Sequence, residues 1–268
     1  MKVIVPCEFS EVSMNAFSYA YKMFEDAEFT VLHVHSGILS KREPVYLESG
    51  MTKDKLLKKE MIRDVCMAVN RNNLPENVTV EVKAGDIIEI INNYVKENQF
   101  DLLVSGTRDK YTLFDKVFGT ISLGMVKATD IPVIMVPRFA KYKVIDQILF
   151  APDRVGKDVQ KFLSLVDKLN TEDPYISFIE IDTSGGKNEI RDDKMKETLA
   201  GYKIKYKYGF ELIEANDISK SILSVAYNKH SDIIAISPHH QNFIETLLFK
   251  SVSKDLILDS KMPLLFVK

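Results

Sequence analysis

The chain carries one pattern of segments twice, and this duplication limits the folds that it can adopt. Three segments of the first half recur in the second half: Val3–Phe9 as Ile148–Arg154, Asp101–Gly106 as Asp232–Ser237, and Ile131–Val136 as Met262–Val267. The last two pairs are 131 positions apart and the first is 145 positions apart, which places an insertion of 14 residues in the first copy, before residue 84. Because the repeat is far longer than a solenoid unit, each copy is expected to be a whole domain.

The length of the chain agrees with this interpretation. Its 268 residues are enough for two domains of about 130 residues, each able to bury its own core. We expect one domain over residues 1–138 and the other over residues 143–268. The segment between them is short and has no glycine-serine or proline-rich character, so the two domains are expected to pack together.

Strand and helix signals alternate along both copies. Apolar runs predict strands at residues 2–6, 29–34, 78–82, 101–105 and 131–136, and again at 146–151, 175–181, 208–214, 232–236 and 263–267. Helices are predicted from Ser10 to about Glu25, from Lys53 to about Asn73, after Asp86 as N-cap with Glu89 completing a capping box, from Thr112 to Thr129, and around Ile218–Val225. Residues 36–50 and 183–187 are predicted to be loops. This alternation predicts an α/β protein of two doubly wound parallel sheets flanked by helices.

Charge and apolar patterning exclude several classes of partner. The net charge is −2, which does not favour nucleic acid or an anionic membrane. The first residues enter an apolar strand directly and lack the features of a signal peptide, and no apolar run approaches the roughly 20 residues that span a bilayer. Cys7 and Cys66 have neither metal-binding nor redox spacing, which favours two reduced thiols. We therefore expect a cytoplasmic protein.

The most informative motif follows the fourth strand of the first copy. Gly106 and Asp109 are separated by two residues, and nine further residues lead to Gly119 and Thr120. Glycine lets backbone N–H groups approach phosphate oxygens closely, and a hydroxyl residue near a helix N-terminus adds a donor. In a doubly wound sheet this region is where ligands bind, together with the residues that follow the first and second strands.

Together, these features resemble the universal stress protein family. The resemblance rests on this glycine motif, on Val5-Pro6-Cys7-Glu8-Phe9-Ser10, on Leu32-His33-Val34 and on the closing Pro-Val strand, and it covers both copies. It implies a five-stranded sheet of order 3-2-1-4-5 in each copy and dimerisation through the last strand. Here the strands 131–136 and 263–267 would join the copies as a pseudo-dimer and cover an exposed edge; a further homodimer is open.

The resemblance also implies an adenine nucleotide such as ATP in the first copy. Its contacts would come from six positions: Glu8, Val34, Gly106, Asp109, Gly119 and Thr120. Two positions depart from the family pattern, because Asp109 replaces a glycine and would repel an anion, and Glu8 is one methylene longer than the usual aspartate. Gly106 and Gly119 have an alternative role in a tight turn and in close packing of helix on sheet.

The second copy keeps the register of the motif and loses its chemistry. Asp153 matches the family acid, but Ser237, His240 and Lys250 stand where the family has glycines, followed by Ser251. These side chains would occupy the space of the phosphates, so we expect the second copy not to bind ATP.

Histidines offer an alternative site. His33 and His35 alternate on the second strand and share a face, and His239 and His240 follow the fourth strand of the second copy. A strand-end histidine bonded to the backbone is the simpler interpretation, and we expect no metal ion. Cys7 is expected to be a passive thiol.

The motifs of common enzymes do not occur in the sequence. At most, weak ATP hydrolysis is expected. The function expected is regulation in a stress response through an unidentified protein partner, gated by the nucleotide. Two alternatives stay open: a protein-interaction scaffold independent of nucleotide, and a binder of another small molecule or metal ion.

Overall fold

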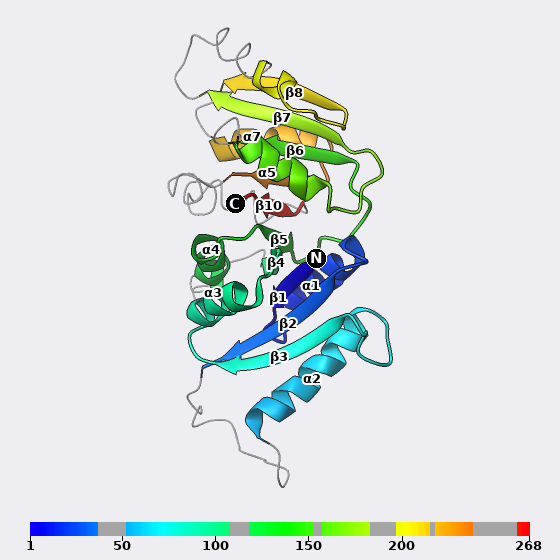
Figure 1. The fold of residues 1–268 in the computed structure, drawn as a ribbon, viewed down its shortest axis with the longest axis vertical. Coiled ribbons are helices and arrows are strands. Elements are labelled where there is room, and N and C mark those ends of the chain that lie inside the picture. The colour runs from blue at the N-terminus through cyan, green and yellow to red at the C-terminus, as the bar shows by residue number, and fades with distance from the viewer. Residues whose placement is uncertain (37–51, 108–117, 153–156, 183–196, 215–217, 238–261) are drawn as a thin grey trace. The chain divides into compact units, whose positions relative to one another are not determined.

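The computed structural model describes residues 1–36, 52–107, 118–152, 157–182, 197–214, 218–237 and 262–268 (Figure 1). The chain divides into two compact units, Met1–Lys141 and Tyr142–Lys268. The predicted loops at 36–50 and 183–187, and the first residues of the helix predicted at 112–129, lie largely outside the described residues.

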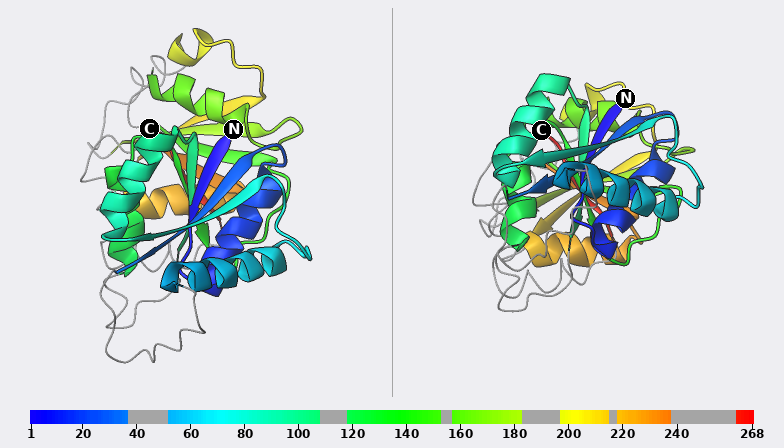
Figure 2. Two further views of the ribbon diagram at one scale, coloured as in Figure 1. Left: turned by 60° about the horizontal axis from the view of Figure 1, so that its bottom comes forward. Right: turned by 90° about the horizontal axis from the view of Figure 1, so that it is seen from below.

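Unit 1 alternates strands and helices in the predicted order. Its strands are β1 (Lys2–Pro6), β2 (Glu28–His35), β3 (Val78–Ala84), β4 (Leu102–Thr107) and β5 (Val133–Pro137). Its helices are α1 (Glu11–Met23), α2 (Lys53–Ala68), α3 (Ile87–Asn98) and α4 (Phe118–Ala128). In Figures 1 and 2, α1 and α2 cover one face of the sheet, and α3 and α4 cover the other.

Unit 2 repeats this arrangement. Its described strands are β6 (Gln147–Ala151), β7 (Tyr175–Asp182), β8 (Tyr208–Glu214), β9 (Ile233–Ile236) and β10 (Leu264–Phe266). Its helices include α5 (Lys157–Val166) and α7 (Ile218–Asn228).

Both sheets confirm the predicted strand order. Unit 1 reads β3-β2-β1-β4-β5 and unit 2 reads β8-β7-β6-β9-β10, which is the order 3-2-1-4-5 in each. The pairs within each unit are parallel, as βαβ crossovers require. In each unit the first strand lies at the centre, between the second and the fourth strand.

The same backbone contacts recur at equivalent places in the two units. Asp101 accepts a hydrogen bond from the Lys2 N–H at 2.8 Å, and Asp232 accepts one from the Gln147 N–H at 2.9 Å. Each aspartate also donates its own N–H to the carbonyl of that same residue. The duplication therefore extends to the side chain that ties the fourth strand to the first.

Local sequence explains how the helices of unit 1 begin. Ser10 is the N-cap of α1 and accepts from the Ser13 N–H, while the Ser13 hydroxyl accepts from the Ser10 N–H. Asp86 is the N-cap of α3 and accepts from the N–H groups of Ile88 and Glu89. The structure shows this cap for Asp86 without the reciprocal bond from Glu89 that a capping box requires.

The phenylalanine side chain at one position of the first helix anchors each core. Phe17 of α1 is fully buried and meets Phe29 edge-on at 6.0 Å. Phe162 of α5, at the equivalent position, stacks on Phe150 of β6 with 4.0 Å between ring centroids. Aromatic contacts of this kind add about 0.5 to 1.5 kcal/mol beyond the burial of area.

Two boundaries differ from the sequence prediction. The α2 helix ends at Ala68 rather than near Asn73, because Asn70 adopts a left-handed backbone with φ of 54°. The β4 strand continues to Thr107, because Gly106 and Thr107 pair with Val136 and Pro137 of β5. Gly106 therefore lies in the sheet rather than in the loop that follows it.

Side chains of α1 hold the segment that follows β5. The Asn15 amide donates to the carbonyls of Pro137 and Ala140, at 3.2 and 3.0 Å. Arg138 forms an ion pair with Glu11 at 2.9 Å. The chain that leaves unit 1 is thus bonded to the first helix.

In the described part of the chain, no helix is long and apolar enough to cross a membrane.

The duplicated aspartates differ in their surroundings, and this difference is testable. Asp232 is buried, accepts from the N–H groups of Asp146 and Gln147, and contacts the Lys143 ammonium. Asp232→Ala would leave two amides without this acceptor, so we expect a loss of about 2 to 4 kcal/mol in the unfolding free energy of unit 2. Asp101→Ala in unit 1, where the bond is exposed, should cost about 1 kcal/mol. Urea denaturation of both variants checks this, and equal losses would contradict it.

Candidate functional site

The strand order of unit 1 reverses between β1 and β4, and this pair defines the candidate site. The two strands are adjacent and parallel, with Val3 opposite Leu102. The chain therefore leaves β1 toward one face of the sheet and leaves β4 toward the other. In doubly wound sheets, the ligand crevice is expected beyond the carboxyl ends of the strands at such a reversal. Cys7 and Glu8 follow β1 at this point, and Gly106 and Thr107 end β4. The structure thus brings the predicted residues Glu8 and Gly106 to the same edge.

Hydrogen bonds of two serines hold the turn from β1 into α1. The Glu8 N–H donates to the Ser13 hydroxyl at 3.3 Å, and the Ser10 hydroxyl donates to the Glu8 carboxylate at 3.3 Å. Phe9, which lies between Glu8 and Ser10, has a φ of 57°. This left-handed conformation costs a residue with a Cβ about 1 to 2 kcal/mol. Strained backbone of this kind persists where surrounding contacts enforce it. The exposed Glu8 side chain is therefore presented from a fixed turn.

The backbone of Val34 extends past the end of β1. The Leu32 carbonyl accepts from the Cys7 N–H at 2.9 Å, and the His35 carbonyl accepts from the Gly85 N–H on the opposite side of β2. Because backbone groups alternate sides along a strand, the N–H and C=O of Val34 point the same way as those of Leu32. The ladder with β1 ends at the pair Pro6 and Leu32. Val34 consequently offers a donor and an acceptor beside the crevice.

Gly106 has a packing role that the sequence left open. A Cβ on this residue would lie 2.6 Å from the Val12 carbonyl oxygen and 2.7 Å from Val12 Cγ1. The first turn of α1 therefore approaches β4 so closely that only glycine fits. Close packing of helix on sheet explains this glycine without a ligand. Val12 is a site residue that sequence reasoning missed, since nothing in the sequence signals a contact between residues so far apart.

Two further predicted residues of the glycine motif, Gly119 and Thr120, lie in α4, at the start of the part of this helix that the structure describes. Asp109 and the other residues between Thr107 and Phe118 lie outside the described residues. The phosphate-binding hypothesis needs the N-terminus of this helix, so it stays a prediction.

His33 and Cys7 lie beneath the β1–α1 turn. The ring nitrogen Nδ1 of His33 is 2.8 Å from the Cys7 carbonyl oxygen and donates to it, which confirms the predicted bond from histidine to backbone. Burial lowers the pKa of His33, so the ring is neutral near pH 7. Burial also raises the pKa of the Cys7 thiol, which removes the thiolate needed for nucleophilic chemistry, in agreement with a passive thiol.

His35 makes a contact that the sequence did not predict. Its Nε2 lies 3.0 Å from an Asp54 carboxylate oxygen, in the first turn of α2. The rings of His33 and His35 stack with centroids 6.3 Å apart, so both point to one face as predicted. Among the residues that the structure describes, no group of three or more histidine, cysteine, aspartate or glutamate side chains is placed to hold a metal ion.

Unit 2 presents different chemistry at the equivalent crevice between β6 and β9. Ser237, the counterpart of Gly106, is fully buried, and its hydroxyl has no hydrogen-bond partner within the described part of the chain. Four further predicted positions lie outside the described residues: Asp153, His240, Lys250 and Ser251. The prediction that this copy does not bind ATP stays a prediction.

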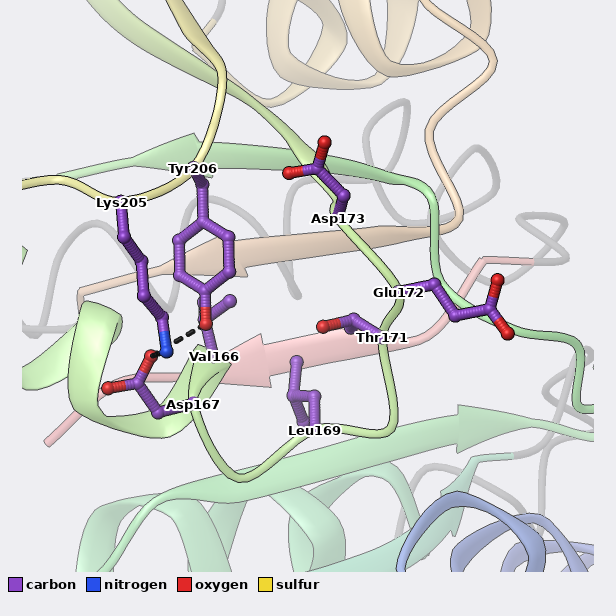
Figure 3. A pocket seen from close by; sticks show the side chains of 8 residues that line it. All are labelled: Val166, Asp167, Leu169, Thr171, Glu172, Asp173, Lys205 and Tyr206. Carbon is purple, nitrogen blue, oxygen red and sulfur yellow. Dashed lines mark hydrogen bonds and ion pairs between the residues drawn. The ribbon is translucent and has the colours of Figure 1, made fainter.

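Two hollows lined by described residues lie at the opposite, amino-terminal edges of the sheets. The hollow in unit 2 has a volume of about 340 Å³, and Figure 3 shows that its Asp167 already bonds Tyr206 at 2.6 Å and Lys205 at 2.9 Å. The hollow in unit 1 has about 480 Å³ and is lined at one side by Tyr94 and Phe100. Neither hollow touches the residues that the sequence motif predicts.

The packing role of Gly106 predicts the effect of adding a single methyl group. Gly106→Ala should lower the melting temperature of unit 1 by several degrees in the absence of any ligand, because backbone of α1 must move. Gly124→Ala is the matched control, since its Cβ would meet side-chain atoms of Ile88, Cδ1 at 2.9 Å and Cγ1 at 3.3 Å, and no backbone. Differential scanning calorimetry compares the two, and an equal melting temperature for both variants would show that the Val12 contact is not limiting.

The lowered pKa of His33 predicts a pH dependence of stability. The unfolded chain binds the proton more readily than the folded chain, so stability is present above the ordinary pKa of 6.5 and declines as the pH falls below it. His33→Gln removes this titration while it keeps a donor. Between pH 7 and about pH 5, the melting temperature of the wild type should fall more steeply than that of the variant. Parallel curves would contradict the assignment.

Comparison with known proteins agrees with this geometry. Residues 1–137 match the model of the Universal stress protein family. A search of curated proteins finds no match. The chain is similar in fold to a universal stress protein from Archaeoglobus fulgidus DSM 4304, with 16% identity, coverage of 100% of this chain and 96% of that chain, and a TM-score of 0.64. It is also similar to a putative universal stress protein from Pseudomonas aeruginosa UCBPP-PA14, with 10% identity, coverage of 100% and 92%, and a TM-score of 0.58. Because the family model covers more than half of the chain and the fold agrees, the chain belongs to the universal stress protein family.

Proposed function

We propose that unit 1 binds an adenine nucleotide at the carboxyl edge of its sheet and that binding regulates contacts with a protein partner in a stress response. The observation that supports this proposal is the backbone of Val34, whose N–H and C=O face the side of β1 beyond the last residue pair of the β1–β2 ladder. Doubly wound sheets usually bind their ligands at this edge, where the strand order reverses.

The Val34 backbone suits the base of the nucleotide. Adenine presents a donor amino group next to a ring-nitrogen acceptor along one edge, and an N–H and a C=O from one residue match that pair. Val34 is itself part-buried and apolar, and apolar residues line most small-molecule sites. Glu8, on the next strand end, has the reach to accept hydrogen bonds from ribose hydroxyls.

The phosphates are proposed to lie near Gly119, at the start of the helix that follows β4. A helix N-terminus presents backbone N–H groups and the positive end of the helix dipole, which favour an anion, and a glycine there leaves the approach without a side chain. The Thr120 hydroxyl is an additional donor by residue type.

The chemistry of the edge supports binding rather than catalysis. The Cys7 thiol stays protonated, and His33 uses Nδ1 on a backbone carbonyl. The proposed role is regulatory, in the cytoplasm, and the second unit is proposed not to bind nucleotide. Joining of the units through their last strands is part of the same proposal.

The packing of Gly106 favours a second candidate function. Since the contact with Val12 explains this glycine without a ligand, the chain is alternatively an interaction module that works without nucleotide.

Thermal stability in the presence of ATP separates these candidates. A ligand at 100 times its Kd stabilises the folded state by about 2.7 kcal/mol, so millimolar ATP should raise the melting temperature of unit 1. Gly119→Lys, which imitates Lys250 of the second copy, should abolish the shift by filling the phosphate space.

The matched control is Asn93→Lys, which adds the same charge to an exposed position of α3 and should keep the shift. A wild type that does not respond to ATP would exclude nucleotide gating. A shift that survives Gly119→Lys would place the site elsewhere.

A further inference from the structure

We propose that His33 is a positioning residue of the nucleotide site, because it keeps the Val34 N–H free to meet the ligand. This inference rests on the proposed function of unit 1 and adds a residue that acts through the backbone. Its side chain lies under the turn, only 9% exposed, so its effect is exerted through the atoms that it holds.

The hydrogen bond from His33 takes the place of a backbone hydrogen bond between β1 and β2. The last bond between β1 and β2 runs from the Cys7 N–H to the Leu32 carbonyl. In a continued parallel ladder the next bond would run from the Val34 N–H to the Cys7 carbonyl. His33 Nδ1 donates to that carbonyl at 2.8 Å instead, and among the described residues no bond from the Val34 N–H to Cys7 is present.

A second contact holds the chain after it turns away. The Phe9 ring meets His33 edge-on, with 4.6 Å between centroids and 66° between planes. This contact helps to enforce the left-handed backbone of Phe9. The imidazole therefore fixes both the carbonyl at which the chain leaves β1 and the residue that redirects it into α1.

The second copy shows the same position without the donor. The register aligns Val3 with Phe29 in unit 1 and Ile148 with Ile176 in unit 2. Four residues further on, Glu180 is the counterpart of His33 and Pro152 is the counterpart of Cys7. Glutamate has no side-chain N–H group, so Glu180 lacks the N–H donor with which His33 bonds the Cys7 carbonyl. The copy that lost the motif glycines thus also lost this donor.

A pair of similar-sized substitutions tests the role of the hydrogen bond. His33→Gln keeps an N–H donor, whereas His33→Met keeps the bulk and has none. We expect ATP affinity, measured by titration calorimetry, to stay within about threefold in the Gln variant and to fall about tenfold in the Met variant. If the Met variant melts at a lower temperature but binds ATP as tightly as the wild type, His33 is merely structural and the proposal is overturned.

Hydrogen exchange supplies a readout that does not depend on ATP. In the Met variant, peptides that cover residues 6–13 should exchange faster than in the wild type, with little change in the Gln variant. Unchanged exchange in the Met variant would overturn the proposed hold on the turn. A wild type without ATP binding removes the proposed function and the nucleotide role of His33 with it, whereas the exchange result still decides whether His33 holds the turn.

Discussion

The parallel pairing of β1 with strands on both of its sides is the constraint on which the rest of unit 1 depends. The crossover that leaves β1, through α1, covers one face of the sheet, and the crossover that reaches β4, through α3, covers the other face. The carboxyl ends of three strands then meet without a helix between them. Glu8, Val34 and Gly106 are far apart in the sequence, and this pairing alone brings them to one edge.

A comparison of the two copies separates the contacts that hold the fold from the residues that differ at the candidate site. The aspartate at the start of the fourth strand makes the same bond in both units, and the helix phenylalanine is retained. At the crevice the copies differ, with Gly106 replaced by buried Ser237 and His33 by Glu180. These differences at the carboxyl edge leave the strand ladders intact, so the residues at this edge vary between the copies while the fold is kept.

The sequence predicted the strands well because each is an apolar run that must be buried on both faces. It predicted the caps Ser10 and Asp86 for a similar reason, since a cap is read from a few neighbouring residues. The roles of site residues were harder to predict. The sequence predicts Gly106 in a loop, yet this residue pairs with β5 inside the sheet. A side chain at this position would clash with Val12 of the first helix, and no local pattern indicates that contact. His35 and Asp54 are likewise separated by a predicted loop, and a local sequence pattern does not indicate which residues such a loop brings into contact.

Because Val12 approaches Gly106 so closely, α1 and the end of β4 are expected to move together. A displacement of the β4 end would move the first turn of α1 rather than compress it, because protein interiors are packed with little free volume. The same helix also bonds the segment that follows β5, through Asn15 and Glu11. A shift of this helix would therefore reach both the end of β4 and the segment by which the chain leaves unit 1.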